Sequence, residues 1–142
     1  MYQKVIVVGY LGRDPEMRYT PDGTPVTSFN MATSKKWNNP DGSKGEETTW
    51  FRVTAWRRQA EIVAQYLSKG SKVLVEGTLK PDKETGGPRV WQRQDGSWGA
   101  SYELTASDVK FMDSKSDRDR DQQVEDYSVG DTSGSFEEEI PF

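Results

Sequence analysis

The chain has 142 residues, a net charge of −4, no cysteine and no histidine. These absences exclude a disulfide framework and the Ser-His and Cys-His catalytic pairs, and they remove the usual ligands of a zinc site. We therefore expect no enzyme, no catalytic residues, no metal and no cofactor, and no run approaches the ~18 apolar residues that span a membrane.

The charge is divided unevenly along the chain. Residues 1–112 hold 16 Lys and Arg against 13 Asp and Glu, a net charge of +3, whereas residues 113–142 hold 3 against 10, a net charge of −7. The second part has too few apolar residues to offset the entropy lost on ordering. We predict a folded domain over 1–112, a disordered acidic linker over 113–136, and a separate tip over 137–142.

Three apolar runs with turn residues between them begin the chain. Residues 3–8 and 17–20 are expected to be strands, and the segment 21–24 between the second and third runs is a turn. A long strand is predicted over 26–37, followed by a mobile hairpin loop over 38–45. Thr27, Phe29 and Met31 share the face of this strand that we assign to the core.

The next stretch, TTWFRVTAWRR over 48–58, has two contrasting faces if it is a strand. Its odd positions 51–55 are apolar. Flat rings that accept a stacked base, beside guanidinium groups that neutralise phosphate, are typical of a surface for single-stranded nucleic acid. The alternative is that both tryptophans pack under a loop or against another subunit. The even positions are Trp50, Arg52, Thr54, Trp56 and Arg58.

A helix is predicted over 59–67, and strands are predicted over 72–80, 89–93 and 98–109, with a hairpin turn over 94–97. The segment 81–88 is expected to be a turn or a hairpin extension. One helix between the third and fourth strands of an otherwise all-β chain predicts an OB-fold, a five-stranded Greek-key barrel. Its strand 2–3 face and its loops are the usual ligand surface, which is where the Trp/Arg face lies.

The sequence resembles the bacterial single-stranded DNA-binding protein (SSB) family over about residues 3–111 and over the last six residues. The likeness rests on KVIVVGYLGRDPEMRYTPDGTPV, FNMATSKKW, TTWFRVTAWRRQAEIVAQYLSKGSKVLVEG and the terminal EEEIPF, in this order. The resemblance implies sequence-independent binding and protection of single-stranded DNA in replication, recombination and repair. It also implies a homotetramer in the bacterial cytoplasm, associated with the nucleoid.

The resemblance also implies roles for individual residues. Stacking aromatics fall on Trp37, Trp50 and Trp56, and a fourth falls on Trp91 if 81–88 is an insertion. Without that gap, Glu84 takes the fourth position. Basic residues near the phosphate path fall on Arg52, Arg58, Lys69 and Lys80, and Arg89 lies on the same predicted strand face as Trp91.

Trp37 has the same strand parity as the predicted core residues Phe29 and Met31. We therefore expect a bulge or a change of face near residues 33–35, without which Trp37 is buried. With the bulge, Trp37 follows Lys35 and Lys36 onto the DNA-binding surface.

The acidic tail ends in two apolar side chains and a free carboxylate, for which a disordered segment has no structural use. We interpret this tip as an anchor for partner proteins, with Phe142 in an apolar pocket and the glutamates on a basic rim. In the resembled family the tip recruits replication, recombination and repair enzymes. The tip residues are Glu137, Glu138, Glu139, Ile140, Pro141 and Phe142.

Three other functions remain open on the sequence. An OB-fold can bind carbohydrate through exposed tryptophans, although that would favour acids and amides over Arg and Lys. It can also serve as an accessory domain that binds protein. The third alternative is a metal-dependent nuclease, for which the run Asp117, Asp119 and Asp121 would have to supply metal ligands.

Overall fold

The structure is a computed structural model that describes residues 1–113. Residues 1–112 form one compact unit. The predicted linker beyond residue 113, the tip over 137–142 and the aspartates at 117, 119 and 121 lie outside the described residues. Among the residues described, no helix has the length and apolar character needed to cross a membrane.

The described chain consists of strands with one helix, as the sequence predicts. The helix follows the fourth strand and not the third, because the short β2 precedes the two long strands β3 and β4. The elements are β1 (Val5–Leu11), β2 (Glu16–Tyr19), β3 (Pro25–Asn38), β4 (Lys44–Trp56), α1 (Arg58–Tyr66), β5 (Lys72–Leu79), β6 (Val90–Gln92), β7 (Trp98–Ala100) and β8 (Tyr102–Phe111).

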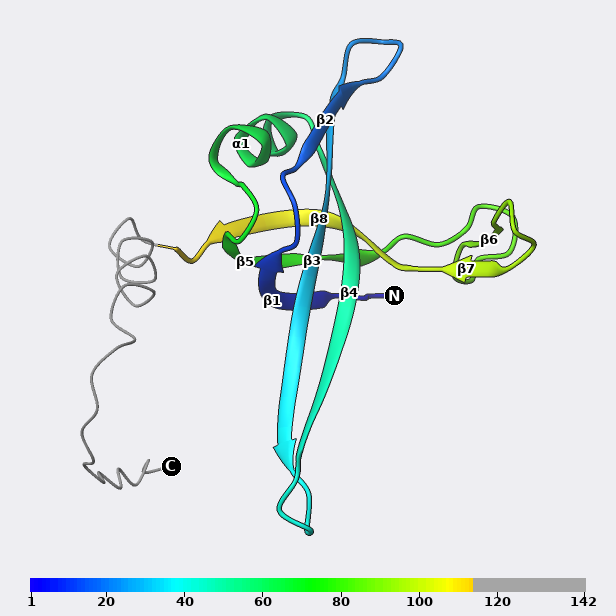
Figure 1. Ribbon diagram of the computed structural model, residues 1–142. Coiled ribbons are helices and arrows are strands. Elements are labelled where there is room, and N and C mark those ends of the chain that lie inside the picture. The colour runs from blue at the N-terminus through cyan, green and yellow to red at the C-terminus, as the bar shows by residue number, and fades with distance from the viewer. Residues whose placement is uncertain (114–142) are drawn as a thin grey trace. The chain divides into compact units, whose positions relative to one another are not determined.

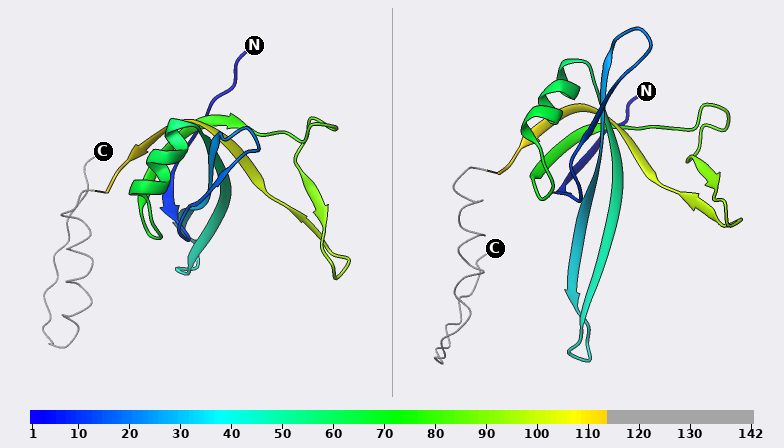
Figure 2. Two further views of the ribbon diagram at one scale, coloured as in Figure 1. Left: turned by 90° about the horizontal axis from the view of Figure 1, so that it is seen from above. Right: turned by 45° about the horizontal axis from the view of Figure 1, so that its top comes forward.

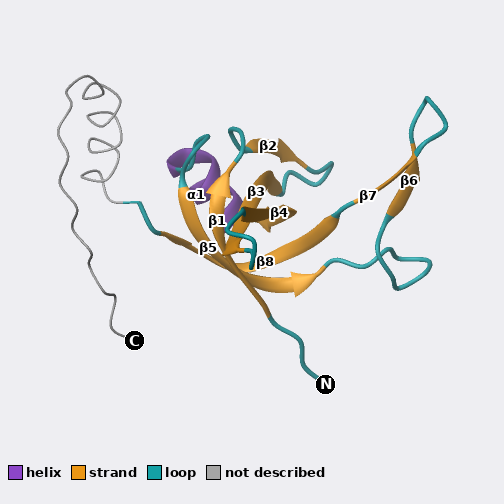
Figure 3. Ribbon diagram, turned by 60° about the horizontal axis from the view of Figure 1, so that its bottom comes forward, coloured by secondary structure: helices purple, strands orange, loops and turns teal. Residues whose placement is uncertain are grey.

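Five of these strands close into a barrel, which confirms the predicted OB-fold. The strands pair in the order β1-β5-β8-β4-β3, and a further pairing between β1 and β3 closes the ring. The β4–β8 pairing is parallel and the others are antiparallel. The short β2 pairs with the first part of β3. In Figure 3 the strands curve round a common interior, with the helix at one end.

The core follows the strand alternation seen in the sequence. Met31, Val53, Ala55 and Leu104 are fully buried, and α1 adds Val63 to the same cluster. The helix is also tied to the barrel by the buried hydroxyl of Thr27 in β3, which donates a hydrogen bond to the Ala60 carbonyl at 2.7 Å. The helix α1 thus covers one end of the barrel, and the polar hydroxyl buried beneath it has a hydrogen-bond partner.

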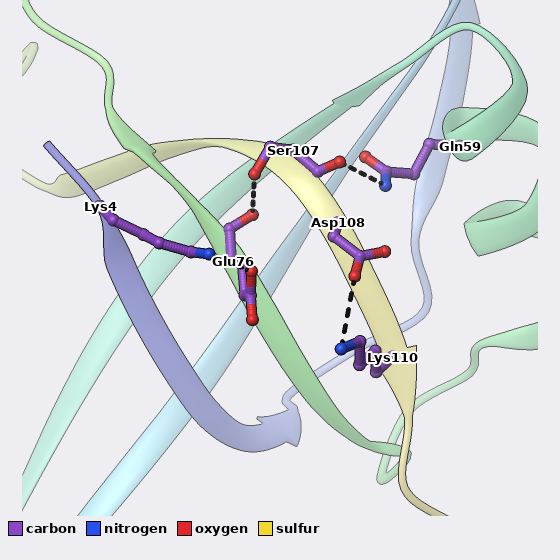
Figure 4. Close-up of polar contacts among 6 residues, drawn as sticks. All are labelled: Lys4, Gln59, Glu76, Ser107, Asp108 and Lys110. Atoms are coloured by element: carbon purple, nitrogen blue, oxygen red, sulfur yellow. Dashed lines mark hydrogen bonds and ion pairs between the residues drawn. The ribbon is translucent and has the colours of Figure 1, made fainter. Parts of the chain in front are cut away.

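A bulge in β8 lets the sheet bend between β5 and β8. The pairing shifts between Glu76 and Gly77, which leaves Ser107 as the extra residue of β8. The Ser107 hydroxyl donates to the Glu76 carbonyl at 3.0 Å, and the Gln59 amide donates to the Ser107 carbonyl at 3.2 Å. Figure 4 shows these bonds beside the ion pair of Lys4 with Glu76, whose N–O distance is 2.6 Å.

Two antiparallel ribbons extend away from the barrel (Figure 1 and Figure 2). The first is the far part of β3 and β4, beyond the pairing of β3 with β1 at Ala32 and of β4 with β8 at Phe51. The second is the β6–β7 hairpin, a separate two-stranded sheet. The single strand predicted over 98–109 is therefore two strands, and Ser101 separates them.

Candidate nucleic-acid interface

The outer face of β4 carries the predicted rings and cation. Trp50, Arg52 and Trp56 are exposed on it, while Val53 between them points into the core. Thr54, which has the same parity as the rings, is buried. The two tryptophans are 53% and 43% exposed, so they are not buried under a loop within the described chain.

Arg58 does not continue this face, contrary to the strand predicted over 48–58. The strand ends at Trp56, and Arg57 turns the chain with a φ of 59°, a left-handed conformation that interrupts the alternation. Arg58 is then the first residue of α1, where its side chain is exposed. The binding of phosphate by Arg58 stays a prediction, with the side chain now placed at the start of the helix and not on the strand.

Arg13, in the loop after β1, joins the β4 face although the sequence reasoning missed it. The side chain of Asn30 in β3, the cross-strand neighbour of Arg52, can be oriented so that its oxygen accepts from Arg13 Nη2 at 2.6 Å and Nε at 3.2 Å. Arg13 and Arg52 line one small hollow, which also includes Asp14 and Glu16. Only the fold brings this loop to β3, so no pattern in the sequence could have assigned it.

Trp37 lies on the first ribbon, and the bulge predicted at residues 33–35 is wrong. The β3–β4 pairing runs without a shift from Val26 opposite Trp56 to Asn38 opposite Lys44. Trp37 is nevertheless 41% exposed, because the ribbon has left the barrel and parity no longer means burial. Its indole N–H donates to the Asn39 side chain at 3.0 Å.

Trp91 lies on β6 of the second ribbon and is 36% exposed. Glu84, the alternative for the same position, lies in the preceding loop, where its N–H and that of Thr85 donate to the Asp82 carboxylate at 2.9 and 3.1 Å. These bonds hold the pKa of Asp82 below its usual value. The segment 81–88 is thus a loop between β5 and β6 that is closed by its own hydrogen bonds.

The other predicted cations are exposed and dispersed. Lys69 lies in the loop after α1, where its N–H donates to the Asp14 carboxylate at 2.8 Å. Lys80 directly follows β5, and its N–H donates to the Glu103 carbonyl. Arg89 directly precedes β6. The structure therefore brings Trp50, Arg52 and Trp56 together, places Trp37 on one ribbon, and places Trp91 and Arg89 on the other.

A hollow of about 670 Å³ lies next to Trp56, lined by the turn between β2 and β3 and by Arg57. Asp22 of that turn accepts hydrogen bonds from the Thr20 hydroxyl and the Thr24 N–H. These bonds lower the pKa of Asp22, the Thr20 hydroxyl having the largest effect, so the carboxylate is ionised at neutral pH. Within residues 1–113 no group of three or more acidic side chains is placed to hold a metal ion.

The fold and this surface define a class of protein: an OB-fold that presents tryptophans and arginines on its strands, as proteins that bind unpaired nucleic acid do. Comparison with known proteins agrees with this class. The profile of the Single-strand binding protein family matches residues 2–112. The chain belongs to this family, which confirms the resemblance found in the sequence.

Individual relatives extend the match. A single-stranded DNA-binding protein of Wolinella succinogenes is 38% identical over 136 residues, which cover 96% of this chain and 80% of the relative. One from Neisseria meningitidis is 41% identical over 109 residues, 77% of this chain but only 59% of the relative. Among solved structures, a Plasmodium falciparum SSB complex with ssDNA superposes with a TM-score of 0.64 at 24% identity, covering 80% of this chain and 97% of that one.

Proposed function

We propose that this protein binds single-stranded DNA with little regard to sequence and protects it during replication, recombination and repair. The observation that carries the proposal is the β4 face, where Trp50 and Trp56 flank Arg52 on one exposed side of a strand. Membership of the Single-strand binding protein family supports it.

The chemistry of this face suits a flexible, unpaired strand. Every base has a π-face that can stack on an indole, so the rings do not select a sequence, and each stacked base contributes about 1–3 kcal/mol. The Arg52 guanidinium, with Arg13 beside it, can neutralise the phosphates between stacked bases. The predicted cations Arg58, Lys69, Lys80 and Arg89, and the rings of Trp37 and Trp91, extend this proposal to the loops and ribbons.

We further infer a binding protein rather than an enzyme, acting in the cytoplasm on the nucleoid. A carbohydrate-binding OB-fold is the competing function, since sugars also stack on exposed tryptophan. The guanidinium of Arg52 between the two rings, with Arg13 beside it, favours DNA over a neutral sugar. An accessory domain that binds only protein would not need a row of exposed rings with arginine between them.

A binding titration tests the proposal. Fluorescence-labelled oligo-dT should bind with an affinity that falls as salt rises, with a log–log slope near −0.7 per neutralised phosphate. Trp50→Ala and Trp56→Ala should each weaken binding while circular dichroism shows an intact fold. An oligosaccharide and a DNA duplex serve as the competing ligands. A salt-independent affinity, or equal binding of the duplex, would contradict the proposal.

We propose that four copies of the chain assemble, as the family resemblance implies. The outer face of β1 supports an assembly, because Ile6, Val8 and Tyr10 are large apolar side chains that lie exposed side by side on one strand face. Sedimentation analysis should give the mass of a tetramer for the wild-type chain and a smaller species for Val8→Glu. A monomeric wild-type protein would contradict this proposal alone.

We propose that the chain is divided by function: 1–112 binds DNA, 113–136 links this domain to the tip, and 137–142 captures partner proteins of replication, recombination and repair. The support is that residues 137–142 combine three glutamates with the apolar side chains of Ile140 and Phe142. Deleting residues 140–142 should leave oligo-dT affinity equal or slightly higher while abolishing capture of partners from a cell extract. Retention of those partners by the truncated chain would contradict it.

A further inference from the structure

The two ribbons that leave the barrel share a sequence pattern. Residues 37–45 read WNNPDGSKG and residues 91–99 read WQRQDGSWG, so both have the form W-x3-D-G-S-x-G. The first spans the tip of β3–β4 and the second spans the whole turn of β6–β7.

The two turns are also built by the same hydrogen bonds. In the first, the Asp41 carboxylate accepts from the Ser43 N–H at 2.9 Å and from the Ser43 hydroxyl at 2.6 Å, and Gly42 has a φ of 84°. In the second, the corresponding distances from Ser97 to Asp95 are again 2.9 and 2.6 Å, and the glycine φ is 86°. A D-G pair at a tight turn accounts for this geometry, since the glycine takes the left-handed conformation.

Each turn places its tryptophan directly opposite a glycine. Trp37 pairs with Gly45, and Trp91 pairs with Gly99. A Cβ added at Gly45 would lie 2.2 Å from Cε2, 2.4 Å from Nε1 and 2.5 Å from Cζ2 of the Trp37 ring. At Gly99 it would lie 2.7 and 2.9 Å from Cε2 and Cζ2 of Trp91, and 2.9 Å from Nη2 of Arg93.

These distances show which part of the ring meets the glycine. Cε2 is a fusion atom with ring atoms on all sides in its plane, so an approach this close comes through the ring face. Trp50 differs: a Cβ at Gly12 would lie 2.6 and 2.7 Å from Cζ3 and Cη2 but 3.9 Å from Cε3, which is contact with the ring edge. Within residues 1–113, Trp37 and Trp91 are therefore the only tryptophans that rest a ring face on a glycine.

A third turn in the chain provides an internal contrast. The turn between β2 and β3 also contains an Asp-Gly pair, Asp22-Gly23, with a φ of 86° at the glycine. At the positions that hold tryptophan and glycine in the other two turns, this turn has Arg18 opposite Val26. The Trp–Gly pair is therefore not a requirement of the turn itself.

We propose that Gly45 and Gly99 are positioning residues for DNA binding: each is a flat seat that fixes the ring of Trp37 or Trp91 with one face covered and the other turned outward for a base. This inference rests on the proposed function. It makes the two ribbons two copies of one base-stacking unit. Any side chain at the glycine would force the ring off the strand, because no real Cβ lies as close to a ring atom as 2.2 or 2.7 Å.

Alanine at either seat tests the proposal without disturbing the backbone. Neither glycine has a left-handed φ, and alanine is compatible with a strand. Gly45→Ala should weaken binding of labelled oligo-dT by about fivefold or more, the lower end of the effect of losing one stacked base. Gly99→Ala should do the same through Trp91, and its cycle with Trp91→Ala separates this loss from the contact of the new Cβ with Arg93. Gly87→Ala is the matched control, since a Cβ there meets nothing closer than 3.7 Å.

The decisive measurement is a double-mutant cycle. In a Trp37→Ala background, Gly45→Ala should cause no further loss of affinity, because the ring it would displace is already gone. A loss that persists in that background, or a Gly45→Ala protein that binds as the wild type does, would overturn the proposal. The Gly99 and Trp91 pair gives an independent second cycle if the first variant folds poorly.

The ring position can be followed without DNA. In protein labelled with 5-fluorotryptophan, Gly45→Ala should shift the Trp37 fluorine resonance and leave that of Trp91 in place, and Gly99→Ala should do the reverse. If neither fluorine resonance moves, the proposal that the two glycines position the tryptophan rings is wrong. If the wild-type protein fails to bind oligo-dT, the proposed function fails and with it the stacking role, whereas the fluorine spectra still report on the seat.

Discussion

Gly9 of β1 lies directly against the carbonyl of Ala32 in β3: a Cβ at position 9 would stand 2.2 Å from that oxygen. This contact lies where the two strands meet to close the barrel, next to the pairing of Tyr10 with Ala32. The neighbour is backbone, which cannot move aside as an indole ring can. Gly9 therefore serves the fold, in contrast to Gly45, whose neighbour is the side-chain ring of Trp37.

We predict that Gly9→Ala destabilises the barrel by about 1–3 kcal/mol, the usual cost of forcing extra volume into a packed site. Thermal unfolding followed by circular dichroism measures it, with Gly87→Ala as the control of equal chemistry in open space. An unchanged melting temperature for Gly9→Ala would show that the two strands can separate slightly at no cost.

The sequence predicts the two faces of β4 well because strand alternation is a local property. Parity alone separates Phe51, Val53 and Ala55 from Trp50 and Trp56, although Thr54, which shares the parity of the rings, is buried. Parity fails for Trp37 because burial also depends on where the barrel ends. That boundary is set by the partners β1 and β8, which the local pattern of β3 does not contain.

Arg13 and the two Trp–Gly pairs show a second limit of sequence reasoning. Arg13 reaches Asn30 only through a tertiary contact, so it has no pattern of its own. The repeated W-x3-D-G-S-x-G did stand in the sequence, and searching for internal repeats would have found it. Its meaning still depends on register, because only the observed pairing puts each glycine under its ring.

Arg13→Ala should weaken oligo-dT binding most at low salt and reduce the slope of log affinity against log salt by about 0.7, the contribution of one phosphate contact. The reason is its position beside Arg52, in the hollow that both side chains line. Arg18→Ala is the matched control, because it also removes one arginine. Arg18 lies on β2, where its Nη2 is 3.7 Å from a carboxylate oxygen of Glu16, and it does not line the hollow. Equal slopes for the wild type and Arg13→Ala would remove Arg13 from the phosphate path.

Trp91→Ala should weaken oligo-dT binding by about 1–3 kcal/mol, as expected for one stacked base. Glu84→Ala should leave affinity the same or raise it slightly, because Glu84 belongs to the loop closed on Asp82 and adds only negative charge. Anisotropy titrations of both variants decide between the two residues for the fourth stacking position. A larger loss for Glu84→Ala than for Trp91→Ala would reverse this assignment.

We predict that acid loosens the two ribbon turns only below the pH at which an unperturbed aspartate becomes protonated. The Ser43 hydroxyl, and then its N–H, donate to Asp41 and hold the pKa of that carboxyl below its usual value, and Ser97 acts on the pKa of Asp95 in the same way. Because each folded pKa lies below the unfolded one, the carboxylate stabilises its turn fully above the unfolded pKa of about 3.9. That stabilisation is lost as the pH falls through the folded pKa.

The amide resonances of Ser43 and Ser97 report this loss directly, because each N–H donates to the titrating carboxylate. Both should titrate below pH ~3.9, and the fluorine resonance of Trp37 or Trp91 should move with the amide of its own turn. In Asp41→Asn the first turn should lose its pH response while the second keeps it. Titration of either amide at or above that pH would mean that the serine bonds do not hold the carboxylates ionised. The shared turn geometry would then not be what keeps the rings in place.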